Sequence, residues 1–138
     1  MDDEALWIAF GKSALAQQEW THEAHLRTAF LFLQEFAVDE AHLRLRAGII
    51  RQNERHGLVE SSTRGYFETL TRAWLLLVAN ARQGSGARDS RELLARCPEL
   101  LDRSLPLRFY SKELLATPRA RAIFVEPDLA PLLVVASV

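Results

Sequence analysis

The chain has 138 residues, of which 49% are hydrophobic and 25% charged, and its formal net charge at pH 7 is -1. This composition is typical of one globular domain, residues 1–138, that is large enough to bury a core without disulfides or metals. The near-zero net charge argues against a general nucleic-acid-binding protein, which needs a basic excess.

The compartment is predicted from three features of the sequence. Cys97 is the only cysteine, so an internal disulfide is excluded. Residues 1–4 are acidic where a secretory signal is basic, and the longest apolar run, residues 73–81, is too short to span a bilayer. We therefore expect a cytoplasmic protein without a membrane partner, and the preference for arginine over lysine indicates a GC-rich bacterial genome.

Apolar residues recur at helical spacing along most of the chain, which predicts an all-α fold. A bundle of four longer helices is expected over about residues 3–18, 21–38, 40–56 and 64–82. The last of these is apolar on all sides near its middle, so it should be the central, most buried helix. Residues 83–88, which are rich in glycine and serine, predict a flexible connection. Short helices should follow over about residues 90–96, 112–116 and 118–124, with another short turn from Pro98.

The last part of the chain, from about residue 125 to residue 138, predicts an extended arm. Pro127 and Pro131 forbid a continuous helix there, and the residues after them are apolar. Two arrangements remain open: the arm lies over its own bundle, or it is exchanged with a second subunit in a homodimer.

Two histidines at the start of the second predicted helix suggest a functional site. His22 and His25 are three residues apart and continue the apolar stripe of that helix, so both rings can point at one place. Such a pair can bind a metal ion or relay a proton. The alternative is that each ring is an amphipathic side chain hydrogen-bonded to backbone.

The fourth predicted helix offers the natural third metal ligand. Glu68 lies near its start on a track that can face inward, and Tyr66 and Thr69 flank it. We therefore predict a site for one divalent metal ion at His22, His25 and Glu68, which leaves an open coordination position. The alternative for Glu68 is a favourable interaction with the dipole of its own helix. His42 and His56 are interpreted as structural.

Several other chemistries are excluded by spacing. The histidines are three apart, whereas the zinc-protease signature needs four. Cys97 precedes a proline, and no serine lies in a glycine elbow. Phosphate-loop and dinucleotide-binding motifs are absent from the sequence.

Five segments carry a recognisable combination of residues: Thr21–Leu26, Gly65–Thr71, Cys97–Leu101, Phe109–Leu115 and Glu126–Leu129. Together they resemble a family of small bacterial all-α proteins of uncharacterised activity. The family pattern is a His-x-x-His helix, a Tyr-His-Glu-Thr segment and a Tyr-Ser-x-Glu segment, and the resemblance covers about residues 20–132.

This resemblance implies that seven residues belong to one site: His22, His25, Tyr66, Glu68, Thr69, Tyr110 and Ser111. Phe67 stands where the family pattern has a third histidine, so either Glu68 replaces that ligand or the site is degenerate. A looser likeness to three-histidine helical bundles that bind divalent metals rests only on helix count and histidine number.

Two functions follow as hypotheses. In the first, the bundle has a His/Glu pocket for a divalent metal or a small-molecule ligand, lined by Tyr66, Thr69, Tyr110 and Ser111. If that protein is an enzyme, the ion activates a water or polarises a carbonyl, or Glu68 is a general base. In the second, the histidines and Glu68 form a buried hydrogen-bond network in a non-catalytic interaction module, and the apolar tail mediates dimerisation.

Overall fold

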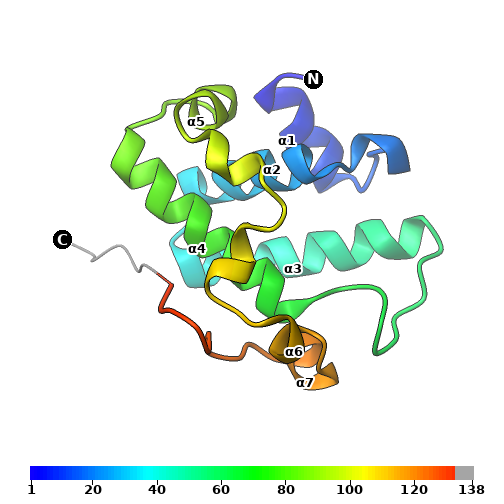
Figure 1. The fold of residues 1–138 in the computed structure, drawn as a ribbon. Helices are drawn as coiled ribbons and strands as arrows, with labels where there is room; N and C mark the ends of the chain where they lie inside the picture. The colour runs from blue at the N-terminus through cyan, green and yellow to red at the C-terminus, as the bar shows by residue number, and fades with distance from the viewer. Residues whose placement is uncertain (133–138) are drawn as a thin grey trace.

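The computed structural model describes residues 1–132, and all of its regular elements are helices. Figure 1 shows α4 crossing the middle of the molecule, with the other helices arranged around it. The α-helices are α1 (Asp3–Gly11), α2 (His22–Glu35), α3 (Val38–Arg55), α4 (Glu68–Ser85), α5 (Ser90–Arg96), α6 (Lys112–Leu115) and α7 (Pro118–Ala122). Three 3-10 helices complete the set: η1 (Gln17–Glu19), η2 (Pro98–Leu101) and η3 (Leu105–Arg108). The predicted all-α bundle is confirmed.

The core lies between α2, α3 and α4, which all contact one another. Phe30, Leu75 and Val78 are fully buried at this junction, and α4 also contacts α5, η3 and α7. Helix α4 therefore lies centrally as predicted, but the expectation that it is the most buried helix is wrong, because nine of the 14 residues of α2 are buried against five of the 18 residues of α4. No helix in residues 1–132 has the length and apolar character needed to cross a membrane.

A polar clamp holds the N-terminal helix on the bundle. The guanidinium of Arg27, which is buried in α2, donates to Ser90 Oγ at 2.8 Å, to the Met1 carbonyl at 2.7 Å and to Asp3 Oδ1 at 3.1 Å. Asp3 in turn accepts from the backbone N–H of Ser90 at 3.0 Å. Because a buried charge is costly without partners, this arrangement ties α1, α2 and α5 together.

Two predicted helix ends are wrong, and in both places backbone geometry gives the reason. The first helix ends at Gly11 and not near residue 18, because Ser13 takes a left-handed conformation with φ 52°. The fourth helix begins at Glu68 and not at Arg64. Gly65 has φ +100°, and the Glu60 carboxylate accepts from the Tyr66 N–H at 2.9 Å, so this stretch turns away from the helix.

The connection predicted at residues 83–88 is shorter than expected. Helix α4 continues to Ser85 and is closed by Gly86 in the left-handed region, with φ 64°. Beyond it, Ala87 is buried, and Gln34 donates to the Arg88 carbonyl at 3.1 Å. The segment between α4 and α5 is therefore fastened to α2.

The described part of the C-terminal arm, residues 125–132, packs against its own chain. The Leu129 N–H donates to the Phe109 carbonyl at 2.9 Å, and the Leu132 side chain is buried. These contacts agree with the first of the two predicted arrangements. The rest of the predicted arm, residues 133–138, lies outside the described residues.

Candidate ligand pocket

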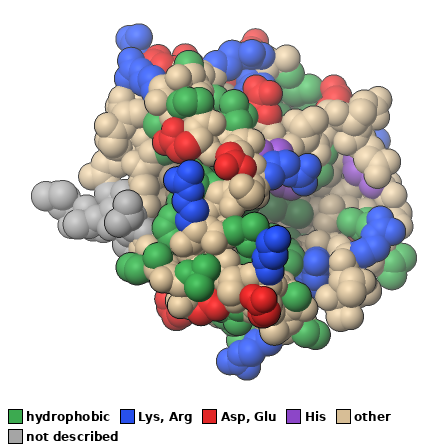
Figure 2. All heavy atoms as spheres, viewed as in Figure 1, with side chains coloured by type: hydrophobic (Ala, Val, Ile, Leu, Met, Phe, Trp, Pro, Cys, Tyr) green, Lys and Arg blue, Asp and Glu red, His purple; other side chains and the backbone are tan. Residues whose placement is uncertain are grey.

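A pocket of about 500 Å³ opens between α2, α3, α4 and the segment that connects α3 to α4. Leucine, isoleucine and alanine side chains from the three helices form much of its wall, and Figure 2 shows a hollow with hydrophobic side chains on this face of the molecule. We call it the arginine pocket. Its lining residues are Trp20, His25, Leu26, Ala29, Leu45, Ile49, Asn53, Leu58, Thr63, Arg64, Gly65, Tyr66, Phe67, Leu70, Thr71, Trp74, Leu75, Arg103 and Arg121.

The charged side chains of the arginine pocket are all cationic. Arg64, Arg103 and Arg121 line it, and the described lining residues include no aspartate or glutamate. Arg64 and Arg103 are exposed and form no salt bridge with residues 1–132. The pocket therefore combines an apolar wall with a positive potential, which favours an anion over a cation.

Arg121 also shapes the wall of the pocket. Its guanidinium donates to the carbonyls of Gly65 at 3.1 Å and Thr63 at 3.3 Å, and it lies 4.4 Å from the centre of the Phe67 ring. These contacts hold the stretch before α4 against α7. Phe67, the position at which the chain departs from the family pattern, is thus part of the pocket wall.

His25 is the histidine that lines the arginine pocket. Its ring stacks on Trp20 with 3.8 Å between the centroids, and neither ring nitrogen has a hydrogen bond to a described residue. His25 is among the exposed residues of α2, so water in the pocket reaches its ring. Desolvation, with the nearby charges of His22 and Arg103, lowers the pKa of His25 below its ordinary value of 6.5. At pH 7 the imidazole is therefore neutral and can accept a hydrogen bond.

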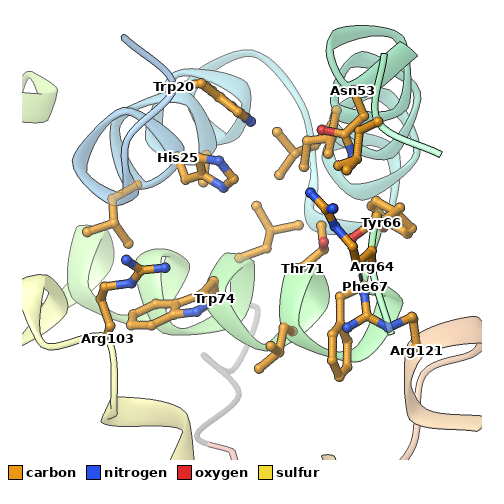
Figure 3. A pocket seen from close by; sticks show the side chains of 18 of the residues that line it. Trp20, His25, Asn53, Arg64, Tyr66, Phe67, Thr71, Trp74, Arg103 and Arg121 are labelled. Carbon is orange, nitrogen blue, oxygen red and sulfur yellow. Dashed lines mark hydrogen bonds between the residues drawn. The ribbon is translucent and has the colours of Figure 1, made fainter. Parts of the chain in front are cut away.

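Figure 3 shows how the labelled side chains are distributed around the cavity. Trp20, His25, Trp74 and Arg103 lie toward one end, and Tyr66, Phe67, Arg64 and Arg121 lie toward the other. Aromatic side chains therefore stand at both ends of an apolar middle.

Behind the pocket wall, Glu68 is the centre of a network of polar side chains. One of its carboxylate oxygens accepts from His42 Nε2 at 2.7 Å and from the Tyr66 hydroxyl at 2.6 Å, and the other pairs with Arg46. Arg72 lies 3.2 Å from His42 Nδ1, which must accept because a guanidinium only donates. His42 is thus a neutral imidazole that carries its proton on Nε2.

The network shifts the protonation equilibria of its members. Burial by itself would raise the pKa of Glu68, but hydrogen bonds from Tyr66, Arg46 and His42 together bring that pKa below its ordinary value. Burial lowers the pKa of His42 and outweighs the contact with Glu68, which raises it. Burial and the Glu68 carboxylate raise the pKa of the Tyr66 hydroxyl. Glu68 is therefore ionised at pH 7, and Tyr66 is held against the pocket as a neutral phenol.

The predicted metal ligands do not form one site, which corrects the expectation for His22, His25 and Glu68. His22 Nε2 bonds to the Leu100 carbonyl at 2.9 Å, and its ring packs edge-on against Trp74. The Glu68 carboxylate instead accepts a hydrogen bond from His42, which the sequence analysis interpreted as a structural residue. Among residues 1–132 no group of three or more His, Cys, Asp and Glu side chains could hold a metal ion. The donor set expected for a divalent metal is thus dispersed over separate contacts.

Of the four residues predicted to line a ligand pocket, Tyr66 lines the arginine pocket and the other three do not. Thr69 Oγ1 donates to the Ile123 carbonyl at 2.9 Å, the Tyr110 hydroxyl donates to the Val125 carbonyl at 2.7 Å, and Ser111 Oγ donates to Asp128 at 2.6 Å. These polar groups bind the segment after α7 to the bundle. Their physical role is to fasten the C-terminal segment.

Comparison of the chain with models of protein families, with curated proteins and with solved structures found no match.

Sequence reasoning missed the three arginines of the pocket. They come from the segment before α4, the turn between η2 and η3, and α7, so the fold alone brings them together. Nothing in their spacing marks them, because isolated arginines in loops are usually solvated surface groups. Trp74 was noted only as part of the apolar run 73–81, and Trp20 was not predicted to line a pocket.

Proposed function

We propose that this protein binds a small organic anion with an apolar body in the arginine pocket. The observation that carries the proposal is the composition of that pocket: an apolar wall, three arginines and no carboxylate among its described lining residues. Its volume of about 500 Å³ falls within the range of pockets that hold metabolite-sized ligands.

The expected binding energy has two sources. Apolar atoms of the ligand would be removed from water against side chains such as Leu26, Leu70 and Leu75, which contributes roughly 25 cal/mol per Å². An anionic group would form charge-assisted hydrogen bonds with a guanidinium, whose planar fork matches a carboxylate or a phosphate. The neutral imidazole of His25 supports the proposal as an acceptor for a hydroxyl or N–H group of the ligand.

The first experiment uses three compounds that share one apolar body and differ in charge: phenylpropionate, phenylpropionamide and phenylpropylamine. Binding is followed by isothermal titration calorimetry and by tryptophan fluorescence, since Trp20 and Trp74 line the pocket. We expect the anion to bind about tenfold more tightly than the amide, and the amine to bind least. The affinity of phenylpropionate should fall as salt is added, because Arg64 and Arg103 are exposed and ions in solution can reach them.

A matched pair of variants locates the site. Arg103→Gln should weaken binding of phenylpropionate, whereas Arg119→Gln should not, because Arg119 is an equally exposed arginine on α7 that does not line the pocket. Equal affinities for the three compounds, or equal effects of the two variants, would contradict the proposal.

A further inference from the structure

The cationic groups of the arginine pocket are divided between its two ends. Arg103 lies at the end formed by Trp20, His25 and Trp74, whereas Arg64 and Arg121 lie at the end formed by Tyr66 and Phe67 (Figure 3).

Helix α4 gives the scale of the distance between the aromatic residues at the two ends, because Phe67 precedes its first residue and Trp74 lies two turns farther along. At the α-helical rise these two positions are about 10 Å apart.

Each end offers a guanidinium that forms no salt bridge with a carboxylate of residues 1–132, although the Glu60 carboxylate lies near the Arg64 end, where it accepts from the Tyr66 N–H. Arg64 and Arg103 are without salt bridges in residues 1–132. The guanidinium of Arg121 is held by two carbonyls, which are neutral, so its charge also remains available. A ligand with a single anionic group would use the positive charge at one end only.

We propose that the ligand carries two anionic groups, one at each end of an apolar middle. Arg103 binds one group, and Arg64, with the charge of Arg121 beside it, binds the other. The apolar middle lies against the part of α4 between the two ends, where Leu70, Thr71 and Leu75 line the pocket. This inference rests on the proposed function and narrows it to one chemical class.

The test compares straight-chain dicarboxylates with monocarboxylates of the same chain length: succinate, adipate, suberate and sebacate against butyrate, hexanoate, octanoate and decanoate. Affinities are measured by isothermal titration calorimetry with the full chain. Within each pair the apolar middle is shared, so the ratio of the two affinities isolates the second anionic contact.

For suberate and sebacate we expect binding about tenfold tighter than for the matching monocarboxylates. Succinate should show no such advantage, because it is too short to reach both ends. Arg103→Gln and Arg64→Gln should each reduce the advantage of the long dicarboxylates to less than about threefold. Both side chains are exposed, so both variants should fold, and Arg119→Gln is the control that should keep the full advantage.

Three results would overturn the inference in distinguishable ways. If monocarboxylates bind as tightly as dicarboxylates at every length, the two-ended ligand is wrong while the proposed function stands. The same holds if the advantage survives both Arg103→Gln and Arg64→Gln. If neither series binds and phenylpropionate also fails to bind, the proposed function is wrong as well.

Discussion

Removal of the Glu68 carboxylate should destabilise the protein far more than removal of an exposed glutamate. In Glu68→Ala, the donors of His42 and Tyr66 lose the oxygen that accepts from both, at 2.7 and 2.6 Å. The His42 side chain is only 7% exposed, so its N–H is left in a buried site, and a donor left without a partner costs about 1–3 kcal/mol. Arg46 is 36% exposed and can be rehydrated, so it adds little. We therefore expect a loss of about 2–4 kcal/mol in the free energy of unfolding.

The assay is urea denaturation at pH 7 followed by circular dichroism. Glu40→Ala is the matched control, because Glu40 pairs with Arg44 at 3.0 Å while both side chains are more than half exposed. That variant should lose less than about 1 kcal/mol. Glu68→Gln keeps the shape of the side chain, so its loss in the free energy of unfolding should lie between those of Glu68→Ala and Glu40→Ala. If Glu68→Ala and Glu40→Ala lose the same free energy, the reasoning about the network is refuted.

Three further predictions test packing, attachment of the C-terminal segment and protonation. Gly48→Ala should destabilise the protein by about 1–3 kcal/mol, measured by urea denaturation, because the new Cβ would lie 2.3 Å from the Phe10 ring. Thr69→Val should cost about 1–2 kcal/mol and speed amide hydrogen exchange at Val125, whose N–H donates to Thr69 Oγ1 at 3.2 Å. His25 should titrate below pH 6.5 by NMR. Below about pH 6.5, His25 then binds a proton more readily in the unfolded chain than in the folded chain. The free energy of unfolding should therefore decrease as the pH falls below about 6.5.

Each of these predictions has a control. Gly84→Ala places a Cβ in open space on the same kind of backbone, so it should be neutral or stabilising. Comparable losses at Gly48 and Gly84 would contradict the packing argument. Unchanged exchange at Val125 in Thr69→Val would show that the segment is held by other contacts. His25→Gln should reduce the decline in stability between about pH 6.5 and 4. If the variant shows the same decline as the parent protein, other titrating groups cause it.

The fold class was predictable because apolar residues recur at helical spacing in α2, α3 and α4. Periodicity did not predict which residues of α2 are buried, because burial extends around that helix and includes Arg27 and Thr28. Helix ends were harder to predict where a single backbone angle decides them. The start of α4 depends on Gly65 with φ +100° and on the Glu60 carboxylate, neither of which changes the apolar pattern. Residues 64–67, predicted as the first turn of the helix, instead form one wall of the pocket.

The candidate site was predicted only in part, for a different physical reason. Periodicity tells which residues share a face of a helix, but the rotation of each helix against its neighbours decides which faces meet. Thus Glu68 did lie inward as predicted, but it meets His42 of α3, and His25 faces the pocket without it. The convergence of Arg64, Arg103 and Arg121 on one pocket could not be predicted, because it depends on the paths of three separate segments of the chain.

The most direct test of the proposed anion binding is a titration of the ¹⁵N-labelled protein with phenylpropionate, followed by amide and indole N–H chemical shifts. The account predicts saturable shifts concentrated at the indoles of Trp20 and Trp74 and at residues 63–67, with little change at Trp7, which packs against Phe32 and does not line the pocket. Shifts spread over the surface, or centred away from the arginine pocket, would contradict it.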